Sequence, residues 1–150
     1  MRPAPWSFLA GRVLLGAVFI VSGFQKLTTP AVNFAAAIEK FEVVGGPSAL
    51  FIAQTLPWLE FAGGVLFVLG LWTTVSGLLL WAMNSGFTLL LASSLIRKLP
   101  IEQCGCFGEA IHLSVPHMLV LDSVFWVLFL LFFAARDRER APSLDKALHG

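Results

Sequence analysis

Four long apolar stretches restrict the fold of this chain more than any other feature. They run over about residues 8–27, 49–71, 73–96 and 115–135. Each reaches the length of about 20 residues that an α-helix needs to cross the hydrocarbon core of a bilayer. Only 13% of the residues are charged, about half the share that a soluble domain carries. The sequence therefore predicts an all-α integral membrane protein, a four-helix bundle whose first partner is the lipid bilayer.

A shorter helix is predicted in the connection between the first two spans, residues 28–48. The stretch NFAAAIEKF places Phe34, Ile38 and Phe41 on one apolar stripe, and its charged residues lie off that stripe. Such a helix suits the membrane surface. Gly45-Gly46-Pro47 is expected to end it.

Loop lengths and charges predict the topology. Only residues 72–74 join the second and third spans, so these two helices are antiparallel neighbours. Six Lys and Arg residues accompany the side that holds both termini, and four accompany the other side. The positive-inside rule then predicts a multi-pass protein of the cell inner membrane with cytoplasmic termini. Residues 1–135 would form the transmembrane domain and residues 136–150 a charged cytoplasmic tail. The net charge of +1 argues against a nucleic-acid partner.

Four polar residues fall inside the predicted spans, namely Arg12, Glu60, Asn84 and Asp122. A charge at the bilayer centre costs at least about 2.5–3.5 kcal/mol, so such residues face the bundle interior and find partners. Counting along the helices predicts that Arg12 reaches Glu60 and that Lys26, at the end of the first span, reaches Asp122. Asn84 is expected to form an interhelical hydrogen bond. The charged residues are either structural ion pairs or a proton-relay or ligand site.

Small residues in the first two spans suit close contacts between helices. We interpret them as packing residues rather than functional ones. They are Gly16, Ser22, Gly23, Gly63 and Gly64.

The two cysteines of the chain lie in IEQCGCFGEA, where Gly105 separates Cys104 from Cys106. A disulfide requires Cα atoms roughly 4.4–6.8 Å apart, and a glycine between the two cysteines permits the necessary bend. The ring would be small and strained, and strained, exposed disulfides are the labile or catalytic kind. It would close almost no loop, so it would stabilise the fold little. The predicted topology places this loop outside the cytoplasm, where disulfides form.

Two features near the start of the fourth span follow the cysteines in the sequence: a helix N-terminus and two histidines. Ser114 is expected to cap this helix, and a helix N-terminus lowers the pKa of a nearby thiol. His112 and His117 complete an alternative metal site with Cys104 and Cys106, and thiolates suit Cu(I) or Zn²⁺. The spacing C-x-C matches structural zinc motifs poorly, because their cysteines are usually two to four residues apart.

Three stretches resemble a known family, namely RVLLGAVFIVSGFQKL, LPWLEFAGGVLFVLG and CGCFG. They are similar to the DoxX superfamily and, more narrowly, to its MauE (methylamine utilisation protein) branch, over about residues 9–135. The resemblance implies a four-helix membrane bundle and a role in the maturation of a periplasmic, disulfide-rich enzyme subunit. It also implies thiol redox chemistry with coupling to quinone. Carried over to this sequence, it marks Arg12, Lys26, Glu60, Cys104, Cys106 and Asp122.

The motifs and the resemblance together predict a membrane thiol–disulfide oxidoreductase or redox-maturation protein. It would act through Cys104 and Cys106 on exported proteins or on a thioredoxin-like partner. Either a thiolate of the pair attacks a disulfide of the partner, or the oxidised pair accepts electrons from partner thiols, and the sequence leaves both directions open. Glu60 or Asp122 would handle protons, and a membrane quinone would be the further electron carrier. No residue pattern makes any cofactor certain.

Two alternatives remain open. The first is a non-enzymatic assembly factor that holds a metal or haem with Cys104, Cys106 and His112. The second is a small-molecule transporter gated by Arg12 and Glu60, although four helices are few for a transporter and no inverted repeat is visible.

Overall fold

The computed structural model describes residues 5–99 and 114–136, and their regular secondary structure is entirely helical. The four-helix membrane bundle predicted above is therefore confirmed. Four of the five helices are long and apolar enough to span a bilayer, within the described part of the chain. The helices are α1 (Pro5–Thr28), α2 (Ala31–Glu39), α3 (Pro47–Leu69), α4 (Thr73–Ile96) and α5 (Val115–Arg136).

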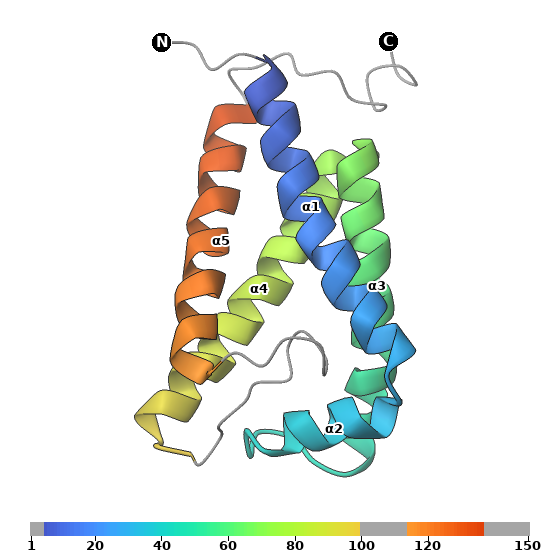
Figure 1. Ribbon diagram of the computed structural model, residues 1–150, viewed down its shortest axis with the longest axis vertical. Helices are drawn as coiled ribbons and strands as arrows, with labels where there is room; N and C mark the ends of the chain where they lie inside the picture. The colour runs from blue at the N-terminus through green and yellow to red at the C-terminus, as the bar shows by residue number, and fades with distance from the viewer. Residues whose placement is uncertain (1–4, 100–113, 137–150) are drawn as a thin grey trace.

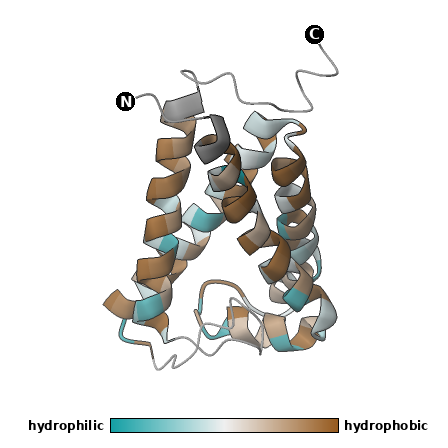
Figure 2. Ribbon diagram, turned by 45° about the horizontal axis from the view of Figure 1, so that its top comes forward, coloured by the Kyte–Doolittle hydropathy of each residue, from teal (hydrophilic) through white to brown (hydrophobic). Residues whose placement is uncertain are grey.

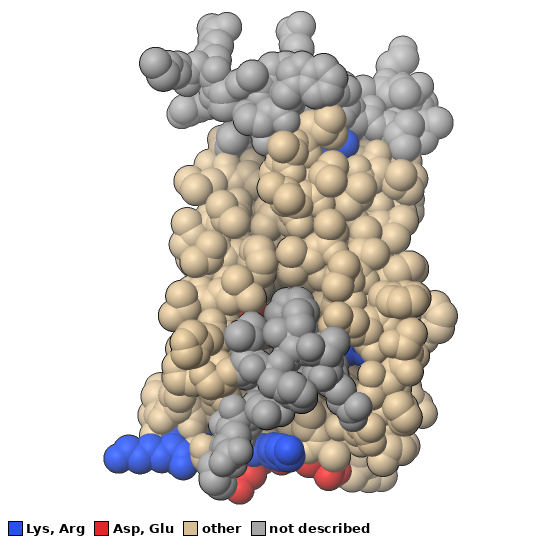
Figure 3. Space-filling model, in the orientation of Figure 1, with Lys and Arg blue, Asp and Glu red and all other residues tan. Residues whose placement is uncertain are grey.

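The long helices run between two ends of the molecule, and α2 lies across one of them (Figure 1). Apolar residues dominate the ribbons of these helices (Figure 2). Large apolar side chains also point outward, and Leu14, Leu89 and Leu131 are 60% exposed or more. Charged side chains gather at the end that carries α2 (Figure 3). Because an apolar belt of this kind suits lipid rather than water, the outer surface of the bundle matches a bilayer environment.

Glycines bring α1 and α3 into close contact, as the sequence predicts. A Cβ atom added at Gly23 would lie 2.7 Å from the backbone nitrogen of Phe61. A Cβ atom at Gly64 would lie 2.9 Å from the carbonyl oxygen of Gly16. Only glycine permits this approach of two backbones, so these residues fix how far α1 is shifted along α3.

The turn between α3 and α4 lies slightly earlier than predicted. Gly70 ends α3 with φ 74°, and Trp72 follows with φ 47°. Two left-handed residues reverse the chain within this short segment, and Thr73 already begins α4. The predicted third span, residues 73–96, is therefore confirmed, and only the assignment of Thr73 and Thr74 to the turn was wrong. The antiparallel arrangement of α3 and α4 is confirmed.

Aromatic side chains fill the half of the bundle away from α2. Phe67 of α3 and Phe129 of α5 are fully buried, with ring centroids 5.8 Å apart. Phe8 of α1 stacks on Phe132 of α5 with centroids 4.3 Å apart. Rings of this size supply much of the buried apolar area of the core, so this half is closely packed.

At the other end, α3 and α4 diverge and α2 lies beneath them (Figure 1). The predicted apolar stripe is confirmed, because Phe34 in α2 and Phe41 in the turn after it are both buried. The predicted end of this helix at Gly45-Gly46-Pro47 was wrong, because α2 ends at Glu39. Arg97, just beyond α4, donates hydrogen bonds to the carbonyl oxygen of Phe41 at 3.0 Å and to the carboxylate of Glu42 at 2.8 Å. These contacts tie the segment after α2 to the end of α4.

Candidate functional site

A buried ion pair joins α1 to α3 near the end of the bundle that carries α2. The Lys26 ammonium donates hydrogen bonds to both carboxylate oxygens of Glu60, at 2.9 and 2.7 Å. It donates a third to the hydroxyl of Ser22 at 2.9 Å, one helical turn earlier on α1. Lys26 is 4% exposed and Glu60 1%. Three donor positions of the ammonium therefore face three acceptors, which is the geometry that lets a charge remain in an apolar interior.

The shift of α1 along α3 explains why Glu60 pairs with Lys26. Gly23 lies against the backbone of Phe61, so Glu60 is level with the turn of α1 that carries Ser22 and Lys26. The predicted contact between Arg12 and Glu60 was therefore wrong. The Arg12 guanidinium lies at the opposite end of α1, where a Cβ atom added at Gly70 would meet its nitrogen at 2.7 Å.

A second carboxylate approaches this pair from α5. Asp122 is 8% exposed and interacts electrostatically with both Lys26 and Glu60. Its Oδ2 atom has no hydrogen-bond partner among residues 5–99 and 114–136. The hydrogen bonds of the Lys26 ammonium go to Ser22 and Glu60, so the predicted direct reach of Lys26 to Asp122 was wrong. The geometry leaves Asp122 with an unused acceptor.

Asn84 positions α5 beside this cluster. Its side-chain amide donates a 2.9 Å hydrogen bond to the backbone carbonyl of Asp122. The predicted interhelical hydrogen bond of Asn84 is thus confirmed. The amide binds the backbone carbonyl of Asp122 and therefore fixes the position of this residue on α5. It does not occupy the carboxylate of Asp122.

A small cavity of about 30 Å³ lies among these groups. That volume is about the share of one molecule in liquid water, and a buried water needs two to four polar partners. The polar residues in the wall come from four helices, and they are Ser22, Lys26, Glu60, Asn84 and Asp122. The cavity thus has room and partners for one water between Asp122 and the ion pair.

Aromatic rings cover the ammonium on the side toward α2. The Lys26 nitrogen lies 5.4 Å from the ring centroid of Phe34 and 5.1 Å from that of Phe87. Contacts of this length between a cation and an aromatic face are attractive.

Cys104, Cys106 and His112 lie outside the described residues. The helix ends that flank them in the sequence, the C-terminus of α4 and the N-terminus of α5, lie at the end of the bundle that carries α2. Ser114 occupies the predicted N-cap position, since its carbonyl accepts the backbone N–H of Met118. The imidazole of His117 contacts the Ser114 hydroxyl at 2.6 Å.

Of the four residues of the alternative metal site, only His117 lies among the described residues. Within residues 5–99 and 114–136, no group of three or more His, Cys, Asp and Glu side chains is placed to hold a metal ion.

Sequence reasoning missed the role of Ser22 and of the two aromatic rings. Ser22 was interpreted as a packing residue, although its spacing of four residues from Lys26 places both on one face of α1. Phe34 and Phe87 carried no polar signal, and their position over the ammonium depends on the tertiary fold.

Comparisons with known proteins identify the family of this chain. A model of the family described as methylamine utilisation protein MauE matches residues 4–135. No curated protein matches the chain, and no solved structure matches it. The match covers all four spans and the polar cluster between them. On this basis the chain belongs to the MauE family.

Proposed function

We propose that this protein is a membrane thiol–disulfide oxidoreductase that matures exported proteins through Cys104 and Cys106. One structural observation carries the proposal. The C-terminus of α4 and the N-terminus of α5, which flank the two cysteines in the sequence, lie at the same end of the bundle as the buried cluster of Lys26, Glu60 and Asp122. Membership of the MauE family supports a role in the utilisation of methylamine or a related substrate.

The exchange follows ordinary thiol–disulfide chemistry. A thiolate of the client protein attacks the Cys104–Cys106 disulfide and forms a mixed disulfide, releasing one cysteine as a thiolate. The second client thiolate then attacks the mixed bond, so the client leaves oxidised and both cysteines are reduced. Two electrons and two protons must leave before the next cycle, and a membrane quinone is the acceptor that takes up both.

The two carboxylates, those of Glu60 and Asp122, are not equally suited to accept a proton. Both Glu60 oxygens accept hydrogen bonds from Lys26, so a proton arriving there would have to displace the ammonium. The free Oδ2 atom of Asp122 faces no such competition among the described residues. We assign Asp122 the role of proton acceptor and Glu60 that of its electrostatic partner. A water in the cavity of about 30 Å³ would connect the two.

The proposed topology follows from the charge distribution along the chain. Both termini lie in the cytoplasm, with residues 136–150 as a charged tail, and the cysteine segment faces the outside of the inner membrane. A client exported across that membrane then meets the cysteines directly.

Replacement of the cysteines tests the proposal. In cells that carry Cys104→Ser together with Cys106→Ser, exported client proteins are expected to accumulate as free thiols, as measured by alkylation and mass shift. A single Cys→Ser variant has no disulfide for the client thiolate to attack, so it is expected to leave the client reduced to the same extent as the double variant. Immunoblots of the membrane fraction control for abundance. Wild-type levels of client disulfides in the double variant would contradict the proposal.

A further inference from the structure

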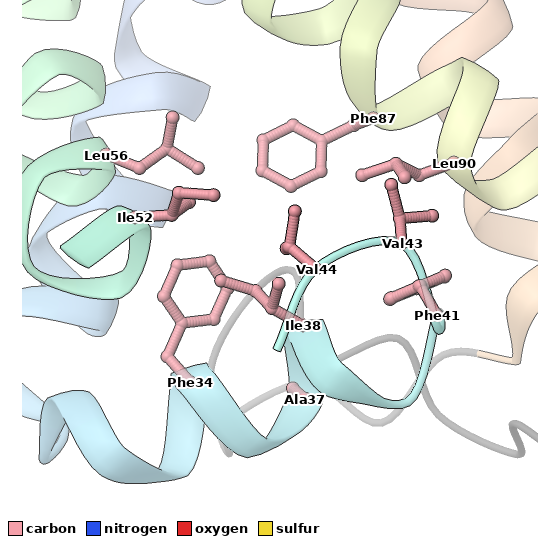
Figure 4. A pocket seen from close by; sticks show the side chains of 10 residues that line it. All are labelled: Phe34, Ala37, Ile38, Phe41, Val43, Val44, Ile52, Leu56, Phe87 and Leu90. Atoms are coloured by element: carbon pink, nitrogen blue, oxygen red, sulfur yellow. The ribbon is translucent and has the colours of Figure 1, made fainter. Parts of the chain in front are cut away.

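A second and larger cavity lies between α2, α3 and α4, with a volume of about 180 Å³ (Figure 4). Its wall is made entirely of apolar side chains. They are Phe34, Ala37, Ile38 and Phe41 of α2 and its C-terminal turn, Val43 and Val44 after it, Ile52 and Leu56 of α3, and Phe87 and Leu90 of α4. This set shares no polar group with the cluster around Glu60.

The divergence of α3 and α4 creates this space. The two helices meet at the short turn after Leu69 and separate toward α2, which closes the gap from below (Figure 1). Side chains from all three helices point into the gap (Figure 4). Ile52 and Leu56 lie five and nine residues inside α3, which is roughly 8–14 Å from its end. The cavity therefore lies within the apolar depth of the spans.

The chemistry of the wall restricts the occupant to hydrocarbon. A buried water needs two to four polar partners, and none of the ten wall residues has a polar side chain. An apolar cavity of about 150 Å³ stays dry and binds benzene, so this one has room for a unit of about six carbons. A phosphate or other headgroup would lose its hydrogen bonds here.

The surroundings of the cavity point to the source of that hydrocarbon. Ile52, Leu56 and Leu90 are only half-buried, so the cavity reaches the outer surface of α3 and α4. That surface matches the acyl region of a bilayer by length and composition. Acyl chains are thus the apolar molecules at highest local concentration along this surface.

We propose that one acyl chain of a bilayer lipid inserts between α3 and α4 and fills this cavity. The chain then packs against Phe34 and Phe87, the same two rings that cover the Lys26 ammonium. A bound chain keeps both rings in place and keeps water away from the ion pair. The inference does not depend on the cysteines, so its test is independent of the test of the oxidoreductase proposal.

Neighbouring alanines on α2 provide a matched test. Ala37 lines the cavity, whereas Ala36 is exposed. Native mass spectrometry of protein extracted in mild detergent would count the phospholipids that stay bound. Wild type and Ala36→Phe are expected to retain one phospholipid, and Ala37→Phe to retain at least tenfold less, because its ring occupies the cavity. Equal retention by the two variants, or none by wild type, would overturn the proposal.

A second pair of variants keeps the test valid if Ala37→Phe does not fold. Ile52→Phe fills the cavity from α3, and Leu50→Phe adds the same ring on an exposed position of that helix. Phospholipids with a photoreactive group on the acyl chain or on the headgroup locate the contact. The acyl probe is expected to label peptides from α2, α3 and α4. A reduction of this labelling in Ile52→Phe but not in Leu50→Phe supports the proposal. Labelling of these peptides only by the headgroup probe refutes it.

Discussion

The two ends of α1 each bury a cation, and the surroundings of the two cations differ. Arg12 and Lys26 are both 4% exposed. Arg12 lies against Gly70 at the turn between α3 and α4, on the closely packed side of the bundle. Lys26 lies near two carboxylates, those of Glu60 and Asp122, and near two aromatic rings that border a cavity. Equal burial of equal charges therefore does not identify the functional end.

Available space and a second buried carboxylate distinguish the Lys26 end. Both cavities described above border this end, one polar and one apolar. Asp122 keeps an acceptor free within the described structure. On this basis we assign the proposed proton chemistry to the Lys26 end.

The largest effect on stability is expected from Glu60→Gln. The substitution leaves the Lys26 ammonium buried without its closest partner, and breaking such a pair costs about 3 kcal/mol or more of unfolding free energy. Denaturant unfolding in detergent micelles measures this loss. The double variant Lys26→Met with Glu60→Gln is expected to be more stable than Glu60→Gln alone, because it removes the unpaired cation. A Glu60→Gln variant as stable as the exposed control Glu42→Gln would refute the importance of the pair.

A smaller effect on stability is expected from Gly64→Ala. Its new Cβ atom would lie 2.9 Å from the Gly16 carbonyl oxygen, and overpacking of this kind costs about 1–3 kcal/mol. Thermal unfolding measures the loss. Gly11→Ala is the control, because nothing lies within 4 Å of the added atom; it should be neutral or slightly stabilising. A Gly64→Ala variant as stable as Gly11→Ala would contradict the close contact of α1 with α3.

The smallest effect is expected from Arg97→Ala, which removes the exposed pair between Arg97 and Glu42. Surface ion pairs contribute about 0.2–1 kcal/mol and weaken with salt. Unfolding at low and high ionic strength should show a small difference from wild type that shrinks as salt rises. A salt-independent loss well above that range would mean that the hydrogen bond to the Phe41 carbonyl supports the whole α2 end.

The sequence predicted the fold well because bilayer thickness limits the possible lengths of a span. All four spans were within three residues of the helices in the structure. The short α2 helix was also predicted, because the apolar stripe of Phe34, Ile38 and Phe41 required a surface to cover. The length of a helix and its apolar face depend on the local sequence, so the periodicity of apolar residues predicts both.

The partner of each charge was not predictable in the same way. Whether Glu60 meets Arg12 or Lys26 depends on the shift of α1 along α3, which periodicity does not contain. Contacts at Gly23 and Gly64 set that shift. Counting residues from the span ends ignored these contacts, and it therefore gave Glu60 the wrong partner. The roles of Cys104 and Cys106 stay a prediction.

The pair of Lys26 and Glu60 also constrains how the protein is made. The two residues are 34 positions apart and belong to consecutive spans. On its own, α3 would carry the unneutralised charge of Glu60 into the bilayer, at a cost of about 2.5–3.5 kcal/mol. Entering beside α1 as a helical hairpin, it presents a neutral pair of Lys26 and Glu60 instead. Membrane insertion of α3 is therefore expected to be less efficient when Lys26 is replaced by an uncharged residue.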